Sequence, residues 1–318
     1  MSTSLEPTSL GGTASSITIN KVAMGLMMLT WTATPVPDEQ AFEAIKAAID
    51  HIPKDRKLLL NSGEFYGGPK HFTANLELLS RFFANPANLR RSVDAVLKAL
   101  DGKKRLDLFE CARIDPKIPV ETIMESLKAL QAEGKFDHIG ISEVSAETLK
   151  KASSVAEIAA VEIEVSPWSY EEETRKVIAT AADLNIPVIA YAPLGRGFLT
   201  GQITKETLPE SDLRRGLARF QDAAMEANQK IVDSLGVIAQ NKGISNAELS
   251  IAFVSNLGPH VVPLPGSSKA HRVRQNLDAG NIKLTEKEMK SITDVLASME
   301  VTGGRYFGMS KEQELLWG

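Results

Sequence analysis

The sequence predicts an α/β fold in which repeated strand–helix units close into a barrel. Short apolar runs alternate with amphipathic segments along the chain, which is the pattern of repeated βα units. No linker divides this series, and 318 residues is a usual length for one such barrel. We expect residues 18–318 to form this single domain. We expect residues 1–17, which are rich in Ser, Thr and Gly, to form a flexible tail.

Seven strands can be placed, each as a short apolar run. In chain order they cover residues 21–25, 57–61, 106–110, 138–141, 160–165, 187–191 and 261–264. The amphipathic segments between them predict helices. The predicted helices cover residues 38–51, 71–83, 89–100, 120–133, 146–153, 171–184, 225–242 and 246–256.

The third strand of an eight-stranded barrel finds no place in this series. The helices predicted over residues 71–83 and 89–100 are separated by Ala84-Asn85-Pro86-Ala87-Asn88 alone. A strand needs about 5 residues besides its turns, so this stretch is too short to cross the barrel wall and return. The sequence therefore predicts a (β/α)8 TIM barrel from which the third strand is missing.

Composition excludes several classes of protein. A net charge of -4 provides no basic field for nucleic acid, and no apolar run approaches membrane-spanning length. The single cysteine, Cys111, excludes an intrachain disulfide, which is consistent with a reducing compartment. The five histidines show no metal-ligand spacing, so we expect no metal site. We expect a cytoplasmic protein that binds neither nucleic acid nor membrane.

An anion site is predicted near the C-terminal end. Residues 263–269, Pro-Leu-Pro-Gly-Ser-Ser-Lys, join an apolar run to a helix that carries Arg272 and Asn276. Free backbone N–H groups and the helix dipole attract phosphate at such a helix start. Arg272 and Asn276 lie four residues apart, so they share one helix face and add donors there. The alternative is that Ser267 caps an ordinary helix with scattered charges.

A second segment points to a nucleotide. The apolar run Ile186-Pro187-Val188-Ile189-Ala190-Tyr191 leads into a glycine-rich loop over residues 192–201. Tyr191 would end a strand, where its ring can cover a flat ligand ring, and glycines let the backbone approach a ligand closely. The alternative for Tyr191 is packing in the core.

Together these segments closely resemble the NADP-dependent aldo-keto reductases. Gly140-Ile141-Ser142-Glu143 and Asn61-Ser62-Gly63-Glu64-Phe65-Tyr66-Gly67 add to the similarity, which extends over roughly residues 18–300. The segment Leu106-Asp107-Leu108-Phe109-Glu110-Cys111-Ala112-Arg113 is most similar to the fungal pyridoxal reductase branch. The resemblance implies a TIM barrel that reduces a small-molecule aldehyde with NADPH. The branch favours reduction of pyridoxal to pyridoxine.

The resemblance also implies a set of cofactor contacts. Ser142 and Glu143 would face the nicotinamide amide, Glu162 would stand where a glutamine often assists, and Tyr191 would stack on the ring. Leu194, Gly195 and Gly197 would follow the pyrophosphate. Around the adenosine phosphate the resemblance places Ser267, Ser268, Arg272, Gln275 and Asn276. Arg272 favours NADP over NAD, because a guanidinium fork suits the extra 2′-phosphate. Alternatively, Ser142 and Glu143 form the capping region of the helix at residue 146.

The catalytic residues match the family less well. Tyr66 corresponds to the tyrosine that acts as general acid, but Asn61 stands where the family usually has Asp. Ala112 stands where it usually has His, and the active-site lysine belongs to the strand that we expect to be missing. Two functions remain open: an aldehyde reductase with impaired activity, and an NADP-binding remnant or regulatory protein without turnover. Residues 306–317 are expected to fold over the barrel mouth.

Overall fold

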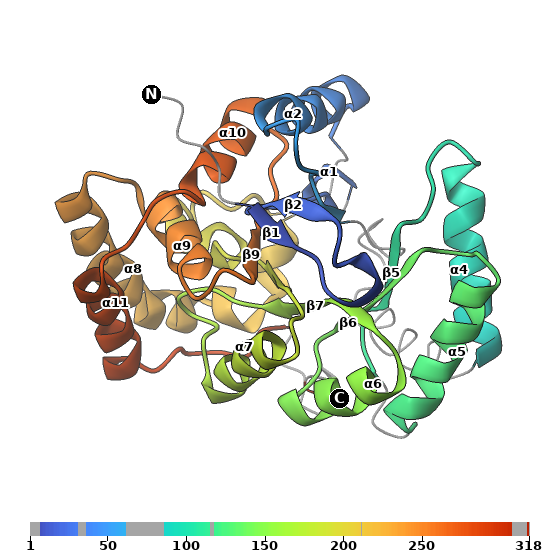
Figure 1. Cartoon of the computed structure of the whole chain (residues 1–318). Coiled ribbons are helices and arrows are strands. Elements are labelled where there is room, and N and C mark those ends of the chain that lie inside the picture. The colour runs from blue at the N-terminus through green and yellow to red at the C-terminus, as the bar shows by residue number, and fades with distance from the viewer. Residues whose placement is uncertain are drawn as a thin grey trace.

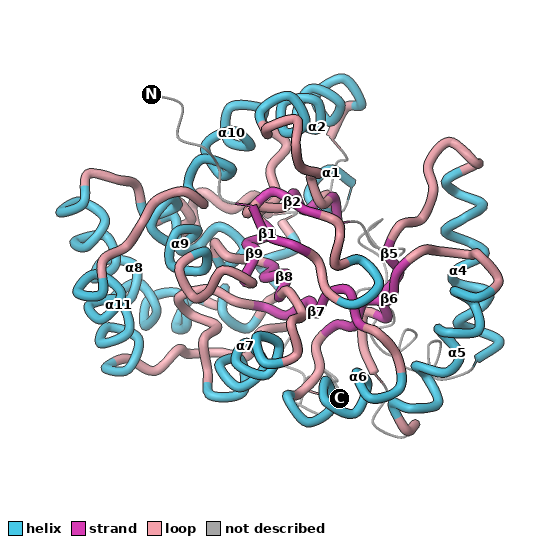
Figure 2. Tube along the Cα trace, viewed as in Figure 1, coloured by secondary structure: helices cyan, strands magenta, loops and turns pink. Residues whose placement is uncertain are grey.

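The computed structural model describes residues 7–30, 36–61, 86–114, 118–210, 212–306 and 317. Within these ranges the chain has an α/β fold, with parallel strands at the centre and helices around them (Figures 1 and 2). The predicted helix over residues 71–83 lies outside the described ranges, and so does Tyr66.

An antiparallel hairpin precedes the central strands. Strand β1 (Pro7–Ser9) pairs with β2 (Thr18–Asn20), and a 3₁₀ turn (Gly12–Ala14) lies between them. Leu10 and Ala14 are buried, and the backbone N–H of Gly11 donates to the carbonyl of Ala159 at 2.9 Å. The predicted flexible tail is therefore wrong for residues 7–17. The buried side chains of Leu10 and Ala14 pack these short strands against the core around Ala159.

All seven predicted central strands are present. They are β3 (Met24–Gly25), β4 (Leu60–Asn61), β5 (Leu108–Cys111), β6 (His138–Ser142), β7 (Ile158–Glu164), β8 (Val188–Tyr191) and β9 (Val261–Leu264). Every pairing among them is parallel. Strands β5 to β9 form one sheet in chain order, and β3 pairs with β4. A parallel bridge between Gly25 and Gly266 joins the two groups, so the pairing runs continuously from β5 round to β4.

The wall has one interruption in the described part of the chain. There, β4 and β5 each pair with a single neighbour, and no pairing joins them. Residues 62–85, which connect them in sequence together with the following helix, lie outside the described ranges. The missing third strand therefore stays a prediction.

The helices of the described residues are α1 (Met27–Thr30), α2 (Asp38–His51), α4 (Pro86–Leu100), α5 (Val120–Ala132), α6 (Ala146–Val155), α7 (Glu172–Asp183), α8 (Asp222–Lys242), α9 (Asn246–Ser255), α10 (Ala270–Ala279) and α11 (Glu286–Ser298). Helices α2 and α4 to α9 follow the predicted ranges closely, α10 is the helix expected to carry Arg272, and α1 and α11 were not predicted. Local signals explain several ends. A capping box starts α9: the side chains of Ser245 and Glu248 each accept a hydrogen bond from the other residue's backbone N–H. Gly243, with φ +75°, ends α8.

The core lies between strands and helices. Every residue of β7 is buried, as is typical of a parallel strand covered on both faces. Outside the sheet, α4 packs beside α5, α2 beside α10, and α8 beside α11 (Figure 1). No helix in the described residues is long and apolar enough to cross a membrane.

Candidate active site

A cavity of about 2090 Å³ opens among the carboxyl ends of the central strands. Residues at or just beyond four strand ends line it, namely Gly25, Ser142, Tyr191 and Leu264. The volume exceeds the 300–1,000 Å³ that is usual for a ligand pocket. The excess arises because the same cavity reaches β4, α4 and β5, which flank the interruption in the wall.

One end of the cavity has the features of a phosphate site. Helix α10 begins after Lys269, and no side chain caps its first turn. The Ser267 hydroxyl accepts a bond from the N–H of Lys269 at 3.1 Å, before the helix starts. Gln40 of α2 donates to the carbonyl of Ser268 at 3.0 Å and fixes the turn. The first N–H groups of α10 are thus left for a ligand, which disfavours the alternative that Ser267 is the helix cap.

Three side chains of α10 extend this phosphate site. Arg272, Gln275 and Asn276 all line the cavity, as do Ser267 and Ser268. Arg272 is exposed and forms no ion pair within the described ranges. A free guanidinium fork beside an uncapped helix start fits an anionic group such as a nucleotide phosphate.

The loop after β8 takes an unusual backbone path. Gly195, Arg196 and Gly197 have φ values of +54°, +53° and +96°. A β-carbon on Gly195 would lie 2.5 Å from Cε2 of Trp168, so this position requires glycine. Leu194 and Gly197 line the cavity, whereas Gly195 lies against the Trp168 indole. The path of this loop thus depends on close packing behind it.

Ser142, Glu162 and Tyr191 meet at the other end of the cavity. They lie on β6, β7 and β8 respectively, and all three line the cavity. The hydroxyl of Tyr191 lies 3.0 Å from that of Tyr306, which comes from the C-terminal segment. Burial, followed by the nearby Glu143, raises the pKa of Tyr191 well above its usual range. Tyr191 therefore stays a neutral phenol.

Glu143 points away from this cavity. Its side chain is fully buried, and its carboxylate accepts a bond from the backbone N–H of Glu164 at 2.9 Å. The other carboxylate oxygen accepts a bond from Arg305 at 3.3 Å. Its backbone has φ +53°. Ser145 caps α6 instead, by accepting a bond from the N–H of Thr148. The side chain of Glu143 thus anchors the C-terminal segment, and it is Ser142 that reaches the cavity.

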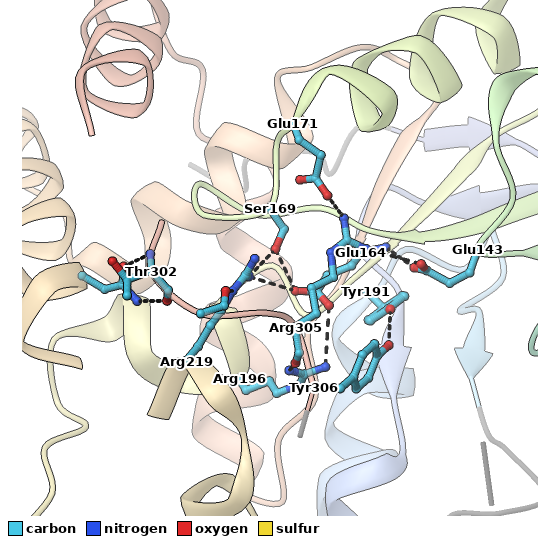
Figure 3. A network of polar contacts seen from close by, with 12 residues as sticks. Glu143, Glu164, Ser169, Glu171, Tyr191, Arg196, Arg219, Thr302, Arg305 and Tyr306 are labelled. Atoms are coloured by element: carbon cyan, nitrogen blue, oxygen red, sulfur yellow. Dashed lines mark hydrogen bonds and ion pairs between the residues drawn. The ribbon is translucent and has the colours of Figure 1, made fainter. Parts of the chain in front are cut away.

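An arginine network holds the C-terminal segment against the barrel (Figure 3). Arg305 lies between Glu143 and Glu171 and contacts both carboxylates. Glu164 lies within 3.6 Å of Arg196 and 3.7 Å of Arg219. These charged pairs place Tyr306 opposite Tyr191. The backbone N–H of Trp317 also donates to the Glu143 carbonyl at 3.0 Å. Of the predicted covering segment, Tyr306 thus lines the cavity, Trp317 lies beside Glu143, and residues 307–316 lie outside the described ranges.

A pair of carboxyl groups lies deeper in the barrel. Glu110 faces Gly140 on the neighbouring strand, where a β-carbon would lie 2.9 Å from its Oε2. The Glu110 side chain can therefore cross β6 and hydrogen-bond Glu162 on β7. Burial raises the pKa of Glu110 to about 7. Burial, and then the charge of Glu110, raise the pKa of Glu162 well above its usual range. The pair therefore retains a proton at neutral pH.

Two residues at this site were missed by the sequence analysis. Glu110 is an acidic residue inside an otherwise apolar strand, and that was its available signal. Arg113 follows the same strand, lines the cavity, and donates to the Tyr306 hydroxyl at 2.6 Å. Of the two residues predicted for catalysis, Asn61 lies in the described part and bonds Glu162. Tyr66 lies outside it. No cluster of metal-binding side chains occurs among the described residues.

Comparison with known proteins decides the family. The sequence profile described as "Aldo/keto reductase family" matches residues 80–297. The chain belongs to the aldo/keto reductase family. It is therefore an oxidoreductase by family. Its parallel strands and surrounding helices match the TIM-barrel fold of that family.

Two curated relatives show how similar the chain is to known members. A probable pyridoxal reductase 2 of Schizosaccharomyces pombe is 33% identical over 321 residues, covering 91% of this chain and 95% of that protein. A probable aldo-keto reductase 1 of Glycine max is 34% identical over 223 residues, covering 70% of this chain and 64% of that protein.

Two solved structures support the fold. A glycerol dehydrogenase of Gluconobacter oxydans superposes with a TM-score of 0.73 at 24% identity, covering 94% of this chain and 97% of its own. A thermostable aldo-keto reductase in complex with the inhibitor epalrestat gives a TM-score of 0.66 at 21% identity, covering 91% and 99%. At these identities the similarity concerns architecture alone.

Proposed function

We propose that this protein is an NADPH-dependent aldehyde reductase, with pyridoxal as its favoured substrate, whose turnover is lowered by the loss of the third strand and its lysine. The observation that carries the proposal is the convergence of residues from distant segments. Ser142, the pair Tyr191 and Leu194, and Arg272 come from three distant parts of the chain and line one cavity.

The residues present fit a dinucleotide phosphate. The uncapped start of α10 offers N–H donors, and Arg272 offers a charged fork without a carboxylate partner among the described residues. Ser267, Ser268, Gln275 and Asn276 would complete the adenosine phosphate site, and Leu194 and Gly197 the pyrophosphate site. Arg272 favours the 2′-phosphate of NADPH over the hydroxyl of NADH.

At the reacting end the protein positions the aldehyde and supplies a proton. Bound NADPH supplies the hydride that reduces the carbonyl carbon. Ser142, the protonated Glu162 and Tyr191 line the same end of the cavity, where the first two would hydrogen-bond the nicotinamide amide and Tyr191 would offer its ring a face. By family resemblance, Tyr66 gives its proton to the carbonyl oxygen. A phenol that lacks a cation beside it is a poor acid at neutral pH, so we expect slow turnover.

Exposed apolar side chains support the loss of the third strand. Phe42 and Ile49 on α2 are 65% and 47% exposed, and Leu60 of β4 is 41% exposed. In a closed barrel, neighbouring units cover such groups. The alignment to the Schizosaccharomyces pombe relative is 321 residues long, but only 91% of this 318-residue chain takes part in it. The alignment therefore contains positions at which this chain has no residue.

The alternative function is an NADP-binding protein without turnover. Asn61 favours it, because this amide stands where the family usually has a carboxylate, and it donates to Glu162 at 2.6 Å. In that arrangement Asn61 organises the carboxyl pair and offers no charge that could tune a catalytic phenol. Both functions share the cofactor site, so they differ in turnover alone.

Steady-state reduction of pyridoxal by NADPH separates the two functions. The unmodified protein is compared with a version that carries the family's third strand and lysine directly before α4, which begins at Pro86. We expect the restored version to turn over at least about 10²-fold faster, because general acid catalysis contributes 10²- to 10⁴-fold. Tyr66→Phe should abolish that gain and change the residual rate of the unmodified protein little. Equal rates in both versions, each abolished by Tyr66→Phe, would show that another group replaces the lysine.

A further inference from the structure

Arg113 is a buried cation without a carboxylate partner in the described part of the chain. It is 7% exposed, yet it lines the cavity. Its Nη1 donates to the Ala112 carbonyl at 2.5 Å and its Nη2 donates to the Tyr306 hydroxyl at 2.6 Å. Its Nε has no hydrogen-bond partner. Neither acceptor is a carboxylate, so no ion pair within the described residues balances the guanidinium charge directly.

The other arginines of this region have carboxylate partners. Arg196 and Arg219 approach Glu164, and Arg305 contacts both Glu143 and Glu171. Arg113 also contacts the C-terminal segment, through the Tyr306 hydroxyl, but it forms no ion pair with a carboxylate in the described residues. Burying an uncompensated charge is costly, and natural proteins retain such a charge where a ligand compensates it.

The nearest acidic groups act on Arg113 only at a distance: Glu143 helps to raise its pKa, but no ion pair joins the two side chains. Glu143 is the partner of Arg305 and lies outside the cavity. Glu162 is close enough for Arg113 to oppose the rise in its pKa, but burial and Glu110 still hold that pKa well above the usual range. Glu162 therefore keeps its proton at neutral pH, and Arg113 lines the cavity as a cation without a direct carboxylate contact among the described residues.

We propose that Arg113 binds an anionic oxygen of the substrate and thereby selects aldehydes that carry a phenolate or carboxylate beside the carbonyl group. This inference rests on the proposed function and names its substrate class. A guanidinium with unused N–H donors suits an anionic oxygen, and the Tyr306 hydroxyl holds it in place by accepting from Nη2. The same Tyr306 hydroxyl lies 3.0 Å from that of Tyr191, so Arg113 stands next to the residue expected to cover the nicotinamide ring.

The test measures binding, so that it does not depend on turnover. Isothermal titration of the full chain saturated with NADP compares pyridoxine, whose ring carries an acidic hydroxyl, with its analogue lacking that hydroxyl. We expect pyridoxine to bind roughly 10- to 150-fold more tightly, which is the effect of one charge-assisted hydrogen bond. Arg113→Gln should remove this preference, and Arg113→Lys, which keeps the charge, should restore part of it.

Controls separate folding from recognition. Arg175→Gln removes an arginine that lies over Tyr170, outside the cavity lining, and should leave the preference unchanged. NADPH affinity, measured on every variant by its fluorescence, should also remain unchanged, which shows that each variant is folded. Equal binding of the two ligands to the unmodified protein would overturn the inference, as would an Arg113→Gln variant that keeps the preference. Failure of the proposed function would appear separately, as absent turnover with the binding preference intact.

Discussion

The side-chain amide of Asn61 donates a hydrogen bond to Oε2 of Glu162 across a distance of 2.6 Å. This bond joins β4, at one edge of the interruption, to β7 in the middle of the sheet. Because Glu162 also bonds Glu110, three side chains from three strands form one polar chain inside an apolar barrel. Such a chain is stable when its carboxyl groups retain a proton, and several of the following predictions concern that condition.

The stability of the protein should fall as the pH rises from about 4.5 towards 7. Glu110 has a folded-state pKa near 7 against an ordinary value of 4.5, so the unfolded chain loses this proton first and is favoured by rising pH. Glu110→Gln should reduce this dependence, leaving the part due to buried Glu162, and stabilise the protein above pH 7 by on the order of 1–3 kcal/mol. Urea unfolding of both proteins at pH 5 and pH 8 checks this. An unchanged difference between the two pH values in the variant would contradict it.

The protein should bind NADPH more tightly than NADH. Arg272 lines the phosphate end of the cavity and forms no ion pair within the described ranges, so it is available to the 2′-phosphate. A charge-assisted contact of this kind contributes roughly 1.5–3 kcal/mol, or about 10- to 150-fold in affinity. Arg272→Ala should erase the preference, as measured by fluorescence titration with each cofactor. Arg274→Ala, on the same helix but outside the cavity lining, is the matched control.

Gly195→Ala should destabilise the protein far more than Gly243→Ala. Both glycines have positive φ values, +54° and +75°, so each substitution strains the backbone by about 1 kcal/mol. A methyl group on Gly243 meets nothing within 4 Å, whereas on Gly195 it would overlap the Trp168 indole. Trp168 stacks on Phe198 at 5.0 Å between ring centres and cannot retreat easily. Thermal melts of the two variants measure the difference; similar losses would show that the loop moves freely.

The unmodified protein should melt at a low temperature and associate with itself. Removing a strand leaves two edges and uncovers apolar side chains. Phe42 and Ile49 lie seven residues apart on α2 and so share one face. Replacing both with Ser should reduce association in sedimentation velocity, whereas Val237→Ser, an isolated exposed residue of α8, should not. A monomer that unfolds cooperatively at an ordinary temperature would argue for an intact wall.

The regular elements of the fold were predictable from sequence because they depend on local periodicity. The helix over Asp38–His51 was predicted to the residue, and each central strand lies within its predicted range or within a few residues of it. The β1–β2 hairpin was not predicted, since its strands have three residues each and contain Pro, Thr and Ser. Such strands are held by contacts to Ala159 and the core rather than by any pattern of their own.

The site could be predicted only in part, for a related reason. Cofactor residues lie in short motifs, so Arg272 and Tyr191 could be found from their neighbours in the chain. The pairing of Arg113 with Tyr306 spans 193 positions and depends on the path of the C-terminal segment. Glu110 reaches Glu162 because Gly140, on the strand between them, has no side chain. Contacts of this kind are created by strand order in the barrel, which no local pattern contains.

The anchoring of Arg305 on Glu143 has a consequence for the synthesis of the protein. A nascent chain that has reached residue 290 already contains every strand described above, but it has neither Arg305 nor Tyr306. Until they emerge, the carboxylate of Glu143 lacks its cation and the cavity lacks part of its lining. The lining of the pocket is therefore complete only once translation has passed Tyr306, well beyond the last described strand.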